Sequence, residues 1–204
     1  MDPSPSPSEE FPQFELCGGH LALDFANTLS QRNAPALATD HLTSYGRLVA
    51  FAEQTQVLSP AQARRFRTHE RSQPMVTQRV LAEAIELREA LHRLFGAVAG
   101  GDTPDDWSLA VLNDRMARLR LGGQLTWEWQ AGPSAPDAFV AAIVRAAVDL
   151  LVAPERERVR FCASDACLWL FLDTSKNGSR RWCDMRQCGN RMKARRFQQR
   201  HQGQ

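Results

Sequence analysis

Apolar residues recur at helical spacing through most of the first 150 residues of this chain. The clearest case is the segment 75–98, whose apolar stripe consists of Val80, Ala84, Leu87, Leu91, Leu94 and Phe95. Such a stripe predicts an amphipathic helix with one buried face. Similar spacing predicts further helices over residues 40–54, 105–121 and 138–152. We expect these helices to share one core.

Local signals indicate where some elements begin and end. Ser59-Pro60-Ala61-Gln62 combines a capping box with proline at the first helical position, which predicts a helix starting at Pro60. Gly100-Gly101 should end the helix over 75–98. Alternating apolar and polar residues in Gln124–Gln130 predict a short half-buried strand. Residues 20–29 fit helical and strand spacing equally, so their pattern leaves that segment open.

The last 50 residues contain short segments of strand composition and a turn before the final predicted helix. Val159–Phe161 and Leu168–Asp173 have strand composition, and Ser175–Ser179 contains an Asn-Gly turn. We expect Arg180–Trp182 to return as a strand beside Leu168–Asp173, and a helix to follow over residues 189–201. The predicted fold class is therefore mostly α with minor β (α+β). It combines a helical N-terminal domain that contains a short β hairpin with a small C-terminal module.

Composition adds little until the chain is divided. The 204 residues are 43% hydrophobic and 24% charged, as in an ordinary globular protein, and no run of about 18 apolar residues suggests a membrane span. The first ten residues carry acid and proline where a secretory signal carries basic and then apolar residues. We therefore expect a cytoplasmic protein with a disordered tail over residues 1–12 and no membrane partner.

The charge is distributed unevenly about Pro154. Residues 1–154 hold 13 Lys+Arg and 18 Asp+Glu, a net of −5, whereas residues 155–204 hold 12 and 5, a net of +7. Four thiolates with one zinc dication would reduce the second figure to about +5. A polyanion is the partner that such a small basic module favours.

Four cysteines of this module have the spacing of a metal site. They form the pattern Cys162-x4-Cys167-x15-Cys183-x4-Cys188, two close pairs separated by enough chain for a hairpin. In a reducing cytosol this pattern favours one bound zinc ion over three other interpretations: disulfides, buried apolar thiols and redox thiols. Four thiolates leave no open coordination position, so the zinc should be structural. Cys17 stands outside the pattern.

The residues around the last cysteine resemble a known family. Cys188-Gly189-Asn190-Arg191, followed by a basic helix, is similar to the CGNR zinc finger, whose resemblance implies a treble-clef fold. The segment Gly18-Gly19-His20-Leu21-Ala22-Leu23-Asp24-Phe25-Ala26-Asn27-Thr28 resembles the opening of the ABATE domain. Together the two resemblances cover almost the whole chain. They imply a bacterial stress-induced transcription regulator with an ABATE-like sensing domain over 13–154 and a CGNR finger over 155–204.

The basic residues of the module are the candidate nucleic-acid contacts. Residues 174–204 contain nine Lys+Arg and a single acid, Asp184, so local pairing cannot neutralise them. The candidates lie on the predicted return strand and the final helix: Arg180, Arg181, Arg191, Lys193, Arg195, Arg196 and Arg200. Asn190 could read an adenine edge, but a backbone hydrogen bond is favoured for it. Arg191 could equally brace the metal site.

A second polar group lies in the N-terminal domain. His20, Asp24, Asn27 and Thr28 are concentrated within an apolar segment. Helix capping and core hydrogen bonds are the default explanation for such residues, and a pocket for a small-molecule effector is the alternative. No phosphate-binding loop, nucleophile elbow or carboxylate pair suggests an enzyme. An enzymatic site around His20, Asp24 and Asn27 remains the minority hypothesis.

The preferred hypothesis is a regulator that binds DNA through the basic helix. A protein-interaction adaptor and an RNA-binding protein are the alternatives, since each could use the same basic surface. The oligomeric state is left open. We expect loss of zinc to unfold residues 159–201 and to leave the larger domain intact.

Overall fold

The computed structural model describes residues 12–124 and 126–202, without the side chains of residues 196, 197 and 200–202. The predicted disordered tail over 1–12 therefore lies outside the described residues except for Pro12. In the described part of the chain the α-helices are α1 (Leu21–Ala26), α2 (Tyr45–Gln54), α3 (Pro60–Ser72), α4 (Pro74–Gly100), α5 (Asp106–Met116), α6 (Val140–Val152) and α7 (Asn190–Gln202). The strands are β1 (Leu29–Ser30), β2 (Thr39–Asp40), β3 (Leu119–Leu121), β4 (Trp127–Trp129), β5 (Val159–Phe161) and β6 (Leu170–Leu172).

Short helical turns complete the described elements. Pro35–Leu37 and Pro154–Arg158 are 3-10 turns, and Met185–Gly189 is a π-helical turn that leads directly into α7. The strands pair as three separate antiparallel hairpins, β1–β2, β3–β4 and β5–β6. The structure is therefore mostly helical with minor β, which confirms the predicted fold class. None of the helices in the described ranges has the length and apolar character needed to cross a membrane.

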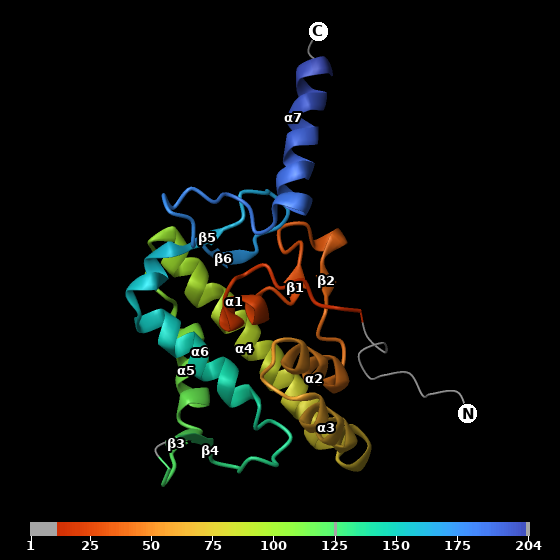
Figure 1. Ribbon diagram of the computed structural model, residues 1–204, viewed down its shortest axis with the longest axis vertical. Helices are drawn as coiled ribbons and strands as arrows, with labels where there is room; N and C mark the ends of the chain where they lie inside the picture. The colour runs from red at the N-terminus through yellow and green to blue at the C-terminus, as the bar shows by residue number, and fades with distance from the viewer. Residues whose placement is uncertain (1–11, 125, 203–204) are drawn as a thin grey trace, which may run out of the picture.

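The long helix α4 is the centre around which the other elements pack (Figure 1). Its buried face carries the predicted stripe, with Leu87 and Leu91 fully buried and Phe95 beside them. Helices α1, α2, α3, α5 and α6 contribute most of the other core residues. Gly101 ends α4 in the left-handed conformation (φ 75°), as the Gly-Gly pair predicts.

Most sequence signals of helix boundaries are confirmed, and two are wrong. Ser59 and Gln62 form the capping box, and α3 begins at Pro60. The helix expected from residue 40 begins only at Tyr45, because Ser44 caps it and Asp40 belongs to β2. The helix expected over 105–121 ends at Met116, because Leu119–Leu121 pairs with β4.

The ambiguous segment 20–29 contains both kinds of structure. It forms α1 and then enters β1. The conformation of Gly18 and Gly19 before it has a steric cause: a Cβ on Gly18 would lie 2.9 Å from the backbone nitrogen of Asp24, and Gly19 has φ 70°. The glycine pair thus brings the chain into close contact with the start of α1.

The C-terminal module pairs its strands differently from our prediction. Val159 pairs with Leu172 and Phe161 with Leu170, so the hairpin joins β5 to β6. The expected return strand Arg180–Trp182 is irregular, with a single backbone hydrogen bond from Ala163 N to Arg181 O. The first cysteine pair consequently lies inside a hairpin and not before one.

The module packs on the N-terminal domain through its β5–β6 hairpin, while its four cysteines lie in a second cluster. Val159 and Leu170 are fully buried in the same cluster as the α4 residues, and β5 packs on α4 while β6 packs on α1. Asn27 on the α1 side donates from Nδ2 to Leu170 O (2.8 Å) and accepts from Leu170 N at Oδ1 (2.9 Å). Leu172 N donates to Gly18 O at 2.8 Å. These contacts tie the hairpin rigidly to α1.

Candidate metal centre and nucleic-acid interface

The β5–β6 hairpin positions the first two cysteines. Cys162 follows β5 and donates its backbone N–H to Trp169 O (2.8 Å), and Cys167 N donates to Ser164 O (2.9 Å). The chain between them turns so that both thiols point to the same place. Leu168, directly after Cys167, adopts φ 52°, and the ring of His92 on α4 hydrogen-bonds Leu168 O at 3.0 Å. The loop from Cys162 to Cys167, here called the knuckle, is therefore held by α4 as well as by the β5–β6 hairpin.

The second cysteine pair lies at the start of the final helix. Cys183 precedes the π-helical turn, and Cys188 lies within it, one residue before Gly189. Asp184 caps the turn by accepting Gln187 N at 2.9 Å. A Cβ on Gly189 would lie 2.7 Å from Sδ of Met185, whose exposed and flexible side chain could move aside, and 3.3 Å from Trp182 Cδ1.

The four sulfur atoms lie where a tetrahedral ion requires them. Cys162, Cys167, Cys183 and Cys188 are all buried, and their Sγ atoms lie within 4.8 Å of one another. The Cys167–Cys183 and Cys183–Cys188 sulfur separations are both 3.7 Å. Zinc–sulfur bonds of about 2.3 Å give a tetrahedral edge of about 3.8 Å, so these separations fit one zinc ion. The predicted structural zinc site is confirmed.

The close approach of the four thiols also shifts their pKa values: hydrogen bonds with Cys167 and Cys183 lower the pKa of Cys162. The neighbouring Cys162 thiol and burial raise the pKa of Cys167 above its usual value, and the Cys162 and Cys167 thiols together with burial raise that of Cys183. Four thiolates cannot coexist in this space without a cation, which zinc supplies. With all four positions taken by sulfur, the ion has no open site for water, and its role is to fasten the knuckle to the start of α7.

Aromatic side chains and one arginine surround the cysteines. Trp169 and Phe171 are buried in the same cluster, and Trp169 Nε1 donates to Leu29 O at 3.0 Å. Arg180 lies over the Phe171 ring at 4.4 Å and donates to Cys17 O (2.9 Å), Trp182 O (2.9 Å) and Cys183 O. Cys17 packs beside the cluster but is not one of its four ligands.

These contacts change the role of Arg180. The sequence predicts a phosphate contact for its side chain, but the structure places its guanidinium against the backbone carbonyl groups of Cys17, Trp182 and Cys183. Arg180 is a half-buried brace between residue 17 and the finger. The sequence could not indicate this because one of the partners lies 163 residues away.

The other basic candidates whose side chains are described are exposed. They are Arg181, which lies 5.5 Å from the Trp182 ring centroid, and Arg191, Lys193 and Arg195 on α7. Helix α7 projects away from the rest of the molecule, so these side chains stand clear of the core (Figure 1). Arg196 and Arg200 lie on α7, outside the described side chains. Asn190 is exposed, and its side chain makes no hydrogen bond to the described residues, contrary to the backbone bond we favoured.

Sequence reasoning missed two residues of this region. Arg186 is exposed on the π-helical turn and extends the basic surface; its place in the acid-poor segment 174–204 was the available signal. His92 supports the knuckle from α4, and burial lowers its pKa to about 4, so it donates as a neutral ring. No sequence signal links His92 to a loop 76 residues away.

A cavity of about 510 Å³ lies beside the metal centre. Asp24, Asn27 and Thr28 line it, together with three zinc ligands and Arg191, so three of the four predicted pocket residues come together there. His20 does not line it; its Nδ1 caps α1 by accepting Ala22 N at 3.4 Å. Asn27 and Thr28 use their polar atoms in hydrogen bonds to backbone groups, as the structural explanation predicts.

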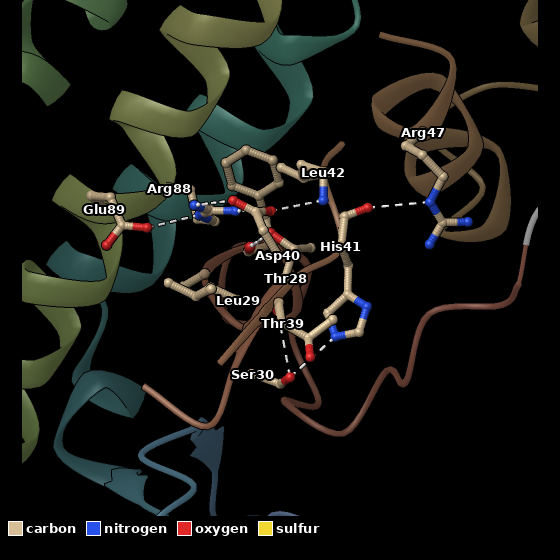
Figure 2. A network of polar contacts seen from close by, with 12 residues as sticks. Thr28, Leu29, Ser30, Thr39, Asp40, His41, Leu42, Arg47, Arg88 and Glu89 are labelled. Carbon is tan, nitrogen blue, oxygen red and sulfur yellow. Dashed lines mark hydrogen bonds and ion pairs between the residues drawn. The ribbon is translucent and has the colours of Figure 1, made fainter. Parts of the chain in front are cut away.

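The β1–β2 hairpin forms one wall of this cavity. Figure 2 shows its polar network: Asp40 receives both terminal nitrogens of Arg88 (2.6 and 3.0 Å) and caps Leu42 N (2.8 Å). His41 O accepts from Arg47 Nε at 3.1 Å, and the His41 ring meets Ser30 Oγ at 3.3 Å. Burial lowers the pKa of His41, so the ring is neutral near pH 7. Hydrogen bonds and an ion pair around Asp40 thus hold this wall to α2 and α4.

The fold and the four-sulfur site define the class: a helical protein that carries a structural zinc finger at its C-terminal end. Comparison with known families agrees. The family described as "Putative stress-induced transcription regulator", ABATE, matches residues 19–154, and the CGNR zinc finger matches residues 158–201. The chain belongs to the ABATE family and ends in a CGNR zinc finger. A search of curated proteins finds no match.

Proposed function

We propose that this protein regulates transcription by binding DNA through α7 and the turn before it, which a treble-clef zinc finger holds in place. The proposal rests on a set of exposed cations around a projecting helix: Arg181, Arg186, Arg191, Lys193 and Arg195. Within the part of the chain that the structure describes, their one ion pair joins Arg195 to Asp165 at 3.5 Å, and both side chains are largely exposed. Surface ion pairs of this kind contribute little, so the cations remain available to phosphate.

The zinc centre gives this surface its geometry. Cys183 and Cys188 fix the start of α7, and the knuckle carrying Cys162 and Cys167 is anchored on α1 and α4 through the hairpin. A helix of this composition has few apolar residues with which to fix its own orientation. Zinc therefore determines how the helix is presented, and the helix carries the charge that meets the duplex.

The proposed role requires no catalytic step. Zinc with four sulfur ligands has no position for a substrate or an activated water, which supports a binding function over a hydrolytic one. The regulator is further proposed to act in stress responses, as the family description suggests.

A binding measurement with matched variants tests the proposal. Fluorescence anisotropy with a labelled random-sequence duplex should show zinc-loaded protein binding DNA, and Lys193→Gln with Arg195→Gln should weaken binding about tenfold while lowering the salt slope by about 2. Arg79→Gln on α4, 71% exposed and remote from the finger, is the control for loss of positive charge. Equal affinity of the double variant and the control would refute the proposal.

Competition separates DNA from the other polyanions. If single-stranded RNA displaces the labelled duplex more effectively than unlabelled duplex does, the protein is an RNA-binding protein. If polyglutamate does so and unrelated DNA does not, the basic surface meets an acidic protein. Under the proposal, duplex DNA is the strongest competitor, and sequences selected from a random duplex pool define the operator.

A further inference from the structure

The cavity beside the zinc centre is formed by segments from both family matches. Asp24 and Asn27 come from the ABATE match, and Cys188 and Arg191 come from the finger. Its volume of about 510 Å³ lies in the range of small-ligand sites. Two aromatic side chains, Phe14 near the N-terminus and Trp169 of the finger, contribute apolar surface to its walls. A pocket of this size at a junction between two modules is a typical place for a ligand.

Charge indicates which kind of ligand the cavity favours. The ionised side chains along its described lining are Glu15, Asp24, Asp40, Asp184, Arg47 and Arg191. Asp40 is neutralised by Arg88, which leaves three carboxylates and two guanidinium groups. Three of the four cysteines also line the cavity, and a zinc ion with four thiolates carries two further negative charges. The cavity is therefore negatively charged.

Asp24 is the carboxylate best placed to receive a cation. Its side chain is 9% exposed, and Oδ1 accepts Gly18 N at 2.7 Å. Within residues 12–124 and 126–202, its second carboxylate oxygen has no hydrogen-bond partner. Burial raises the pKa of Asp24 to about 6, and the Gly18 N–H and the positive charge of Arg180 offset this rise only in part. A cation bound at this position would supply the missing compensation.

We propose that this cavity binds a compact organic cation, with Asp24 as its counter-ion, and that binding is coupled to the DNA affinity of α7. The apolar part of the ligand would lie against Trp169, because the Arg47 guanidinium already lies over the Phe14 ring at 4.1 Å. The binding part of this inference stands on the cavity alone, whereas the coupling rests on the proposed function.

The coupling has a physical route through the π-helical turn. Gln187 and Cys188 of the turn line the cavity, and Arg191 lines it from the first turn of α7. Gln187 Nε2 also donates to Glu15 Oε1 at 2.7 Å, so the turn is linked to the N-terminal segment on the opposite wall. A ligand that contacts both walls would fix the turn where α7 begins. By thermodynamic reciprocity, ligand and DNA should then change each other's affinity by the same factor.

Three probes of similar size test the binding part: benzylammonium, benzyl alcohol and benzoate. Each is titrated into zinc-loaded full-length protein while the indole signal of Trp169 is followed by NMR. We expect saturable shifts with benzylammonium and much weaker binding of the other two. Asp24→Asn should lower benzylammonium affinity about tenfold, whereas Glu155→Gln, an exposed carboxylate outside the cavity, should leave it unchanged.

Glu15→Gln provides a second variant whose folding is not in question, because Glu15 is exposed and glutamine retains an acceptor for Gln187. We expect it to lower benzylammonium affinity about twofold, as loss of a rim charge should. Equal binding of benzyl alcohol and benzylammonium, or no saturable Trp169 shift with any probe, would overturn the inference.

A DNA titration tests the coupling. Saturating benzylammonium should raise duplex affinity about threefold in wild type and leave it unchanged in Asp24→Asn. Unchanged affinity in wild type would overturn the coupling. Absence of DNA binding in every sample would refute the proposed function, while the NMR titration would still decide the binding part.

Discussion

Asp24 is a carboxylate in a buried position, and burial disfavours its charged form. The side chain is 9% exposed, yet it is a carboxylate held against the backbone N–H of Gly18. The sequence shows that Asp24 is a polar residue in an apolar segment. It does not show that Asp24 lines a cavity, because other residues of the lining lie between 167 and 191 and come near it only in the folded chain. Its environment has a measurable effect on stability.

Replacing Asp24 by asparagine should stabilise the ligand-free protein in a pH-dependent way. The pKa of about 6 in the folded protein lies above the ordinary aspartate value of 3.8, so wild type loses stability as pH rises through this range and the carboxylate ionises. Asparagine resembles the neutral acid and avoids that cost. The stability gain should therefore grow between pH 4 and pH 7 and level off at about 3 kcal/mol or less.

Urea denaturation of Asp24→Asn and wild type across this pH range measures the effect. Glu155→Gln serves as the exposed control and should show no such trend. A gain that is constant with pH would show that the ionisation of Asp24 carries no cost in the folded protein.

The residues of the metal centre illustrate what sequence can and cannot predict. The four cysteines could be identified because ligand type and spacing are local properties of the chain. Arg180 could not, because its partners Cys17 and Cys183 are brought together only by the folded chain. Residue type predicted a phosphate contact for it, and tertiary hydrogen bonds determine a bracing role.

Among the elements, the β5–β6 hairpin links the helical domain to the zinc centre. Strand composition predicted both strands, but not that they pair with each other. The Asn-Gly sequence favoured a turn that would pair Leu168–Asp173 with residue 180 onward. Asp173 overrides that preference by accepting Ser175 N (2.9 Å) and Arg180 N (3.0 Å), which leaves the returning segment irregular.

Asn27 should be essential to this link. Its amide satisfies both the N–H and the C=O of Leu170, which is fully buried. Asn27→Ala would leave both groups unpaired and should lower the free energy of unfolding by about 2–3 kcal/mol. Hydrogen exchange at the Leu170 amide should accelerate more than exchange in α3.

The matched control for this variant is Asn113→Ala, which removes an exposed side-chain amide on α5. It should change stability by less than about 0.5 kcal/mol. Equal losses in the two variants would mean that the Asn27–Leu170 pair does not hold the hairpin to α1.

At the scale of the whole molecule, the β5–β6 hairpin of the finger packs in the core of the helical domain, and the four cysteines form a second cluster with Trp169 and Phe171. Helical periodicity predicted the α4 stripe and the mostly helical fold, and the charge division at Pro154 located the basic module. The pattern could not show that Val159 and Leu170 pack in the same core as the α4 residues, because packing between elements does not appear in local periodicity. We therefore expect residues 159–201 and the larger domain to unfold together.

Removing zinc should destabilise the entire chain. Chelation removes the ion that joins the Cys183–Cys188 segment to Cys162 and Cys167. The loss of structure should spread to α1 and α4, because β6 and β5 pack on these helices. We expect a single unfolding transition that moves to lower temperature on chelation, with loss of protection in α1 as well as in the finger. Circular dichroism and hydrogen exchange on zinc-loaded and chelated samples measure it.

A chelated sample that retains the melting temperature of the larger domain would show that the finger folds separately. Metal analysis of the reduced protein should accompany the experiment and should give about one zinc per chain.

The salt dependence of duplex binding tests the central claim most directly, namely that zinc holds a basic helix as a DNA-binding surface. Affinity of the zinc-loaded chain should fall linearly on a logarithmic plot, with a slope of about −4, as expected for four or five neutralised phosphates. The same measurement on the chelated chain should show weaker binding and a shallower slope. A zinc-loaded protein whose association with duplex DNA is absent or insensitive to salt would contradict the account.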